Sequence, residues 1–89
     1  MNLPYGDSVD LVIRLYGRAA DHLYETPIND SQTLHEVAPD TAELRVKVNN
    51  TEELKWWILG FGANVEVILP VKLRDEISQE FQRAAKRYC

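Results

Sequence analysis

Residues 43–49 alternate strictly between polar and apolar side chains. The apolar positions are Leu44, Val46 and Val48, and a polar residue stands between each pair. Because successive side chains of a strand point to opposite faces, this spacing places all three apolar side chains on one face. The pattern predicts a β-strand with one buried face, and it is the clearest element in the chain.

Other segments have the spacing of strands or of helices. Leu11, Ile13 and Leu15 repeat the period of two, whereas later apolar residues recur every three or four positions. Turn-forming residues separate the segments. We expect further strands at residues 10–16, 32–37 and 65–69, and helices at residues 18–25, after Asn50, and across residues 73–88.

The helix after Asn50 carries the two tryptophans of the chain. Asn50 and Glu53 have the spacing of a capping box, and Gly60 and Gly62 are expected to end the helix in the left-handed conformation. Neighbouring helical side chains lie about 100° apart, so only one tryptophan can join the apolar stripe. We expect Trp57 in the core with Leu54, Ile58 and Phe61, and Trp56 at its flank, where it either covers the last helix or offers a contact surface.

The order of these elements is β-α-β-β-α-β with a further C-terminal helix. Two crossovers around a hairpin are typical of an α+β fold, the ferredoxin-like split βαβ sandwich (βαββαβ). In that topology the first and third strands are central, and the helices cover one face of an antiparallel sheet. The last helix would then present Leu73, Ile77, Phe81, Ala84 and Tyr88 to the sheet.

Length and composition favour a single small soluble domain. The chain has 89 residues, and we interpret residues 1–9 as a lead-in or linker remnant and residues 10–89 as the domain. A net charge of −4 makes it a poor binder of duplex DNA, since such binding depends on neutralising phosphates. Cys89 is the only cysteine, which excludes an internal disulfide, and no apolar run is long enough for a membrane span. We expect a cytoplasmic protein.

The sequence carries no constellation of catalytic residues. Its glycines form no phosphate-binding loop, and none of its serines stands in a nucleophile elbow. His22 and His35 are too isolated to suggest a metal site, and helix N-terminal position accounts for Glu52 and Glu53. We therefore expect no enzymatic activity, no metal and no cofactor.

The uncovered face of the predicted sheet holds the candidate binding residues. Alternation places Arg14 and Tyr16 from the first strand beside Arg45 and Lys47 from the third. Val12 and Ile68 lie on the same face, and His35 joins them if Leu34 points inward. This face is either simply solvated, as antiparallel sheets allow, or it contacts a partner, a ligand phosphate or single-stranded nucleic acid.

The chain resembles the C-terminal extension (WCX) of WYL-domain transcriptional regulators. The longest similar stretch is residues 53–62, which continues through residues 65–68 to Pro70. Residues 11–15 resemble the opening strand of the family, and Ser31 and Gln32 resemble its His-Pro-Ser-Gln turn. The closing helix is similar over residues 73–77 and 84–88. Asn29 and Asp30 replace the histidine and proline of the turn, and Leu15 replaces an aromatic residue.

The resemblance implies a regulatory domain that contributes to dimer contacts and to the effector response. DNA binding would then belong to a winged-helix domain of the parent chain, which also has a WYL domain. The residues expected to contact an anionic effector, single-stranded nucleic acid or a partner subunit are Arg14, Tyr16, Gln32, Arg45 and Lys47. For Gln32 the alternative is a turn residue whose amide binds local backbone groups. A second candidate function is a stand-alone module that binds a small ligand between subunits, as ACT domains do.

Overall fold

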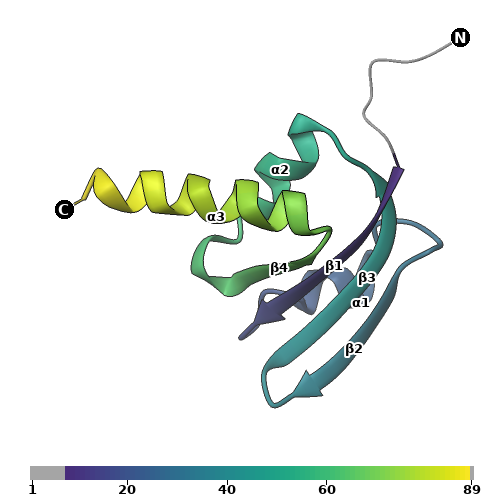
Figure 1. Ribbon diagram of the computed structural model, residues 1–89. Helices are drawn as coiled ribbons and strands as arrows, with labels where there is room; N and C mark the ends of the chain where they lie inside the picture. Colours follow the sequence, from purple (N-terminus) through teal and green to yellow (C-terminus); the bar gives the residue numbers. More distant parts are fainter. Residues whose placement is uncertain (1–7, 89) are drawn as a thin grey trace, which may run out of the picture.

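Strands and helices alternate over residues 8–88, which are the residues that the computed structural model describes (Figure 1). The described residues form four strands, three α-helices and one short 3-10 helix. The elements are β1 (Ser8–Tyr16), α1 (Asp21–Glu25), β2 (Thr33–Ala38), β3 (Thr41–Asn49), α2 (Glu52–Leu59), η1 (Gly62–Asn64), β4 (Val65–Leu69) and α3 (Val71–Lys86).

The four strands form one antiparallel sheet in the order β2-β3-β1-β4. β1 pairs with β3 over its whole length, from Ser8 opposite Asn49 to Tyr16 opposite Thr41. On its other side β1 pairs with β4, where a register shift falls between Val12 and Ile13. The prediction that the first and third strands are central is therefore confirmed, and the α+β class is confirmed with it.

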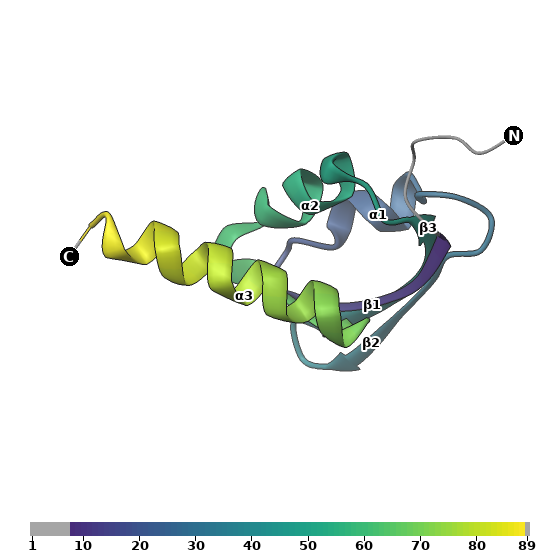
Figure 2. The same cartoon turned by 45° about the horizontal axis from the view of Figure 1, so that its top comes forward.

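The core lies between the sheet and the helices. Leu11, Ile13 and Leu15 of β1 are fully buried, as is Leu44 of β3, which explains the alternation in both segments. Figure 2 shows α1 and α2 on the same side of the sheet. α2 contributes Ile58, which is also fully buried, to this core. Trp57 and Phe61 pack against it with their ring centroids 4.9 Å apart, in an edge-to-face arrangement.

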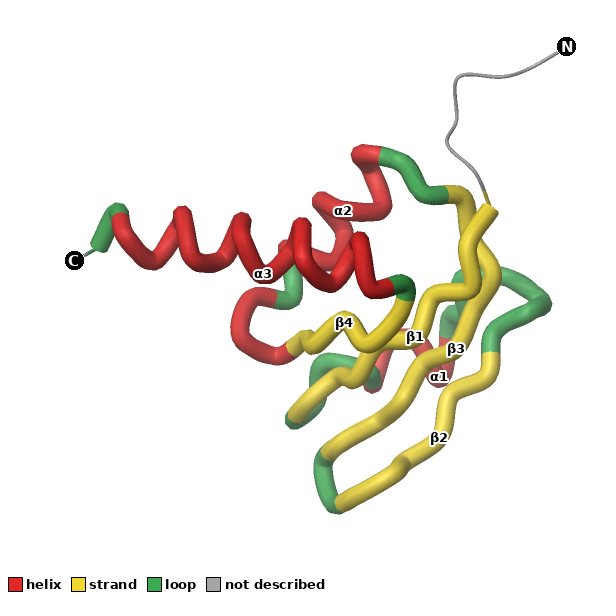
Figure 3. The backbone as a smooth tube through the Cα atoms, viewed as in Figure 1, coloured by secondary structure: helices red, strands yellow, loops and turns green. Residues whose placement is uncertain are grey.

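The last helix, α3, packs mainly on β4 and α2 rather than across the central strands. Leu73 and Ile77 in its first half are buried, and Phe81 is partly buried against the core. Ala84 and Tyr88 are exposed, because the second half of α3 projects past the sheet, as the tube in Figure 3 shows. The prediction that the whole apolar stripe of this helix faces the sheet is wrong for these two residues.

The ends of the helices also differ from the sequence prediction. Thr51, not Asn50, caps α2, and its hydroxyl accepts a hydrogen bond from the backbone N–H of Leu54 at 3.1 Å. Gly62 has the expected positive φ of 61°, whereas Gly60 at −63° is an ordinary helical residue. α1 begins three residues later than expected, because turns precede it at residues 17–20.

Two predicted segments fall partly or wholly outside the described residues. The predicted lead-in covers residues 1–9, of which residues 1–7 lie outside the described part, while Ser8 and Val9 belong to β1. Cys89 lies outside it as well.

Candidate functional site

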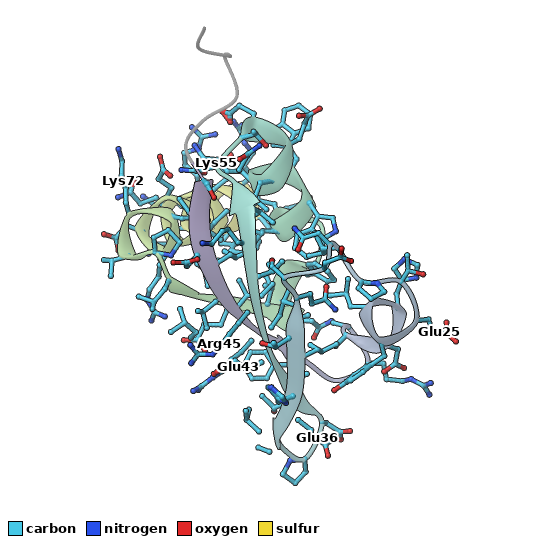
Figure 4. The ribbon with its side chains drawn as sticks, turned by 90° about the vertical axis from the view of Figure 1, so that its right-hand side faces the viewer. Glu25, Glu36, Glu43, Arg45, Lys55 and Lys72 are labelled. Carbon is cyan, nitrogen blue, oxygen red and sulfur yellow. The ribbon has the colours of Figure 1, made fainter. Side chains whose placement is uncertain are left out.

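The outer face is the side of the sheet that points away from α1, and it comprises β1, β3 and β2 with Glu66 of β4 at its edge. Figure 1 shows these strands uncovered within the described residues, with α1 behind them, and Figure 4 shows Glu43 and Arg45 on the side opposite α1. The residues that lie opposite them on neighbouring strands, and every second residue from there, belong to the same face. The outer face is made by Asp10, Val12, Arg14, Tyr16, His35, Glu43, Arg45, Lys47 and Glu66.

Glu43 lies between two arginines of the outer face. Its carboxylate is 3.5 Å from Nε of Arg14 and 3.0 Å from Arg45. The side chain of Glu43 is only 16% exposed, whereas those of Arg14 and Arg45 are 44% and 61% exposed. Each guanidinium therefore uses part of its hydrogen-bonding edge on Glu43 and keeps the rest accessible. Guanidinium groups with free N–H donors suit a carboxylate or a phosphate oxygen.

A second carboxylate, Glu66 of β4, joins Tyr16 to the last helix. The Tyr16 hydroxyl donates a hydrogen bond to Glu66 Oε1 at 2.6 Å. Arg74 of α3 lies 3.1 Å from Glu66 Oε2 and donates a further hydrogen bond to the backbone carbonyl of Val67 at 2.9 Å. Because Tyr16 and Arg74 both stabilise the carboxylate, the pKa of Glu66 is lowered, and the same hydrogen bond raises the pKa of Tyr16.

The Tyr16–Glu66 hydrogen bond predicts a specific pH dependence of stability. A lowered carboxyl pKa stabilises the folded state above the ordinary value of 4.5, and this contribution is lost as the pH falls through the folded-state pKa. Tyr16→Phe should therefore lower the melting temperature at neutral pH, and the difference from the wild type should shrink as the pH falls from about 6 to about 2. Thermal melts followed by circular dichroism measure both.

Tyr24→Phe is the matched control, because Tyr24 is 55% exposed and its hydroxyl makes no hydrogen bond with the described residues. Its melting temperature should follow that of the wild type at every pH. A difference between Tyr16→Phe and the wild type that is as large at low pH as at neutral pH would contradict the prediction.

The outer face carries more acidic residues than the sequence analysis assigned to it. Three bases of the outer face (Arg14, Arg45 and Lys47) meet three carboxylates (Asp10, Glu43 and Glu66), and Arg74 of α3 adds a fourth base at its edge, so the face is close to electrically balanced. The alternation that placed Arg45 outward also places Glu43 outward, so that residue could have been found. The contribution of Arg74 required the position of α3, which periodicity does not give.

Two apolar residues were expected to be exposed on the outer face. Val12 is only 5% exposed, although it points away from the core. It lies opposite Arg45 on one side and Leu69 on the other, so long neighbouring side chains cover it. Ile68 is half-buried. Part of this face is therefore already packed, and its accessible part is polar.

Gln32 lies apart from the other four expected site residues. Its Oε1 accepts a hydrogen bond from the backbone N–H of Ile28 at 2.8 Å, and its Nε2 donates to the carbonyl of Leu23 in α1 at 3.2 Å. The side-chain amide thus ties the end of α1 to the loop that leads into β2. Arg14, Tyr16, Arg45 and Lys47 are brought together by the sheet, and Gln32 is not among them.

The residues next to Gln32 fasten the same loop to β3. Asn29 Nδ2 donates to the carbonyl of Lys47 at 2.9 Å, and the backbone N–H of Lys47 donates to Ser31 Oγ at 2.9 Å. β2 begins opposite Arg45, so the backbone groups of Lys47 have no partner strand on that side. The side chains of Asn29 and Ser31 take the place of that strand.

Neither a metal-binding cluster nor a membrane-spanning helix is found among the described residues. No group of three His, Cys, Asp or Glu side chains lies close enough to bind a metal within residues 8–88. In the same part of the chain, no helix has both the length and the apolar character to cross a membrane.

The comparison with curated proteins gives no match. Among protein families, the WCX domain matches residues 7–85, a range that includes all four strands, α1, α2, nearly all of α3 and the loop of Gln32. The expected resemblance is thereby confirmed, and the family implies a C-terminal domain of a WYL-type transcriptional regulator. The chain belongs to the WCX domain family.

Proposed function

We propose that this domain is the regulatory and subunit-contact module of a WYL-type transcriptional regulator and that it has no catalytic activity of its own. The observation that carries the proposal is the outer face, where Arg14 and Arg45 share Glu43 and keep part of their donors accessible. In a WCX domain, such a face can report the presence of an effector or of a neighbouring subunit to the rest of the regulator.

We also infer that the domain has the ferredoxin-like split βαβ architecture with one added helix. The sheet order β2-β3-β1-β4 and the antiparallel pairing of all neighbours support this inference. In this arrangement each βαβ unit leaves a gap for a strand of the other unit. The middle of the outer face lies on β1 and β3, and each of these strands is paired on both sides, so neither can shift without disturbing its neighbours.

The balance of charges on the outer face favours a partner with charges of both signs. Asp10, Glu43 and Glu66 would repel a polyanion, so a protein surface or a single carboxylate or phosphate group fits better than a nucleic-acid strand. We assign DNA contact to the winged-helix domain of the parent regulator, in keeping with the net charge of −4 of this chain. The expected partners are a second subunit and the WYL domain, in the cytoplasm.

The test is the double variant Arg14→Ala/Arg45→Ala in the parent regulator. We expect a weaker effector response or weaker subunit association, because the only accessible guanidinium pair that shares a carboxylate on the described outer face is lost. The fold should remain intact, since exposed ion pairs contribute about 0–1 kcal/mol each. Reporter expression, gel filtration and circular dichroism measure these three quantities.

Arg18→Ala/Arg83→Ala is the matched control. It removes the same charge from two exposed i,i+3 ion pairs, one with Asp21 and one with Glu80, which lie outside the outer face. This control should leave the effector response unchanged. If both double variants behave like the wild type in folded form, the outer face has no part in regulation and the proposal is wrong.

A further inference from the structure

The edge strand β4 has the composition of a segment that pairs readily with other strands. Its sequence, Val-Glu-Val-Ile-Leu, holds four apolar residues, three of them β-branched, and a single charge. Within residues 8–88, β4 pairs with β1 on one side and with no strand on the other. Short segments of high β-propensity and low charge promote pairing between molecules where such an edge is open. The single charge of β4 is little protection against this.

The opposite edge strand, β2, carries protection in its own sequence. Leu34 packs against the core, and Glu36 lies on the same face opposite Ala42. An inward-pointing charge of this kind is one of the devices by which edge strands avoid pairing with other molecules. The inward residues of β4, in contrast, are Val65 and Val67, and both are buried. Protection of β4 therefore has to come from another element.

The side chain of Arg74 passes the open edge of β4. Arg74 belongs to α3, which packs on the core side of β4 through Leu73 and Ile77. Glu66 stands between the two core valines of β4 and therefore points to the outer face. Arg74 reaches this carboxylate at 3.1 Å and the backbone carbonyl of Val67 at 2.9 Å. Because β1 occupies the other side of β4, the path from α3 to the outer face runs past the open edge.

One nitrogen of Arg74 makes both contacts, and this fixes the guanidinium against the strand. Nη1 donates to Glu66 Oε2 and to the carbonyl of Val67, while Tyr16 holds the other oxygen of Glu66 at 2.6 Å. An incoming strand pairs with an edge through backbone N–H and C=O groups. Here it would meet a carbonyl that already accepts a charged donor, and it would have to bury a side chain that is 47% exposed.

We propose that Arg74 protects the open edge of β4 against pairing with a strand of another molecule. Glu66 anchors the guanidinium, and Tyr16 orients Glu66. The inward valines of β4 are needed in the core, so a charge supplied from α3 protects the edge without disturbing that packing. The inference is independent of the proposed function, because it concerns the edge of the sheet and not the arginine pair of the outer face.

Thioflavin T fluorescence and light scattering of the 89-residue chain test the proposal, with a reductant present because Cys89 is a thiol. Arg74→Ala removes both contacts of the guanidinium and leaves β4 itself unchanged. We expect this variant to keep the wild-type circular dichroism spectrum before aggregation begins. It should then form thioflavin-positive aggregates with a lag time about tenfold shorter than that of the wild type.

Two control variants separate the open edge from lost charge and lost stability. Arg83→Ala removes the same charge from α3, but the ion pair that it breaks is with Glu80 of the same helix. Gln32→Ala breaks two hydrogen bonds at α1 and leaves Arg74 in place. Both controls should keep the wild-type lag time. If either aggregates as fast as Arg74→Ala, the charge or the stability accounts for the effect and the proposal is wrong.

A double variant tests whether β4 is the strand that pairs. Arg74→Ala/Ile68→Lys places a new charge on β4 at a half-buried position. A lysine on an edge strand opposes pairing with other molecules, so this variant should return to the wild-type lag time. An Arg74→Ala chain that aggregates no faster than the wild type, or a double variant as fast as Arg74→Ala, would overturn the proposal.

Discussion

Replacing Ile58 with alanine is expected to lower the free energy of unfolding of the domain more than any other single change considered for this chain. Ile58 is fully buried and is the only residue of α2 that is. Removal of a buried isoleucine side chain down to alanine costs about 2–5 kcal/mol, because the cavity fills only in part. A chain of this length has a free energy of unfolding of roughly 4–13 kcal/mol. The variant therefore loses a large share of the total.

Urea unfolding followed by circular dichroism measures this loss as a lower midpoint at an unchanged slope. Val71→Ala is the matched control, because Val71 is also a branched apolar residue of a helix but is 60% exposed. The control should change the free energy of unfolding by about 0.5 kcal/mol or less. An Ile58→Ala variant as stable as Val71→Ala would mean that α2 is not anchored through Ile58.

Gln32→Ala is expected to destabilise the domain by about 1–3 kcal/mol. The amide of Gln32 bonds two backbone groups, of Ile28 and of Leu23, and alanine satisfies neither. α1 has only five residues, and a helix this short depends on hydrogen bonds and contacts with the rest of the domain. The backbone amides of α1 should therefore exchange with solvent faster in the variant. Urea unfolding and hydrogen exchange measure the two effects.

Gln82→Ala provides the comparison, since Gln82 bonds only Ser78 on the exposed side of α3. It should change stability little. In the folded parent regulator, Gln32→Ala should bind the effector as the wild type does. If Gln32→Ala instead leaves stability unchanged and weakens effector binding, then Gln32 is a binding residue and its backbone contacts are incidental.

Periodicity predicted the sheet because burial of one face leaves a signal in every second residue. Leu11, Ile13 and Leu15 are fully buried, as their spacing indicates, and Leu34 packs against the core, which places His35 on the outer face beside Glu43. The same reasoning placed four of the five expected site residues on one surface. The sequence alone was therefore enough to assign these four residues to their strands and to one face of the sheet.

The contacts that the sequence did not predict are those between different helices, strands and loops, because periodicity does not give the distances between them. Glu66 and Arg74 meet only because α3 turns back along β4, and Gln32 reaches Leu23 only because the loop folds over the end of α1. The position of α3 was wrong in its second half for the same reason. The helical spacing of its apolar residues is genuine, but the sheet ends before the helix does.

The central position of β1 affects how the chain emerges during synthesis. β1 is made first, yet its two neighbours end at Asn49 and Leu69, so about fifty residues must follow before both edges of β1 are paired. At roughly 5–20 residues per second, the nascent strand stays incomplete for several seconds. During that interval the run from Leu11 to Leu15 is an unprotected aggregation-prone segment, interrupted by Arg14 and preceded by Asp10. We expect these two charges, which in the folded domain lie on the outer face, to act earlier as gatekeepers that keep the unfinished chain soluble.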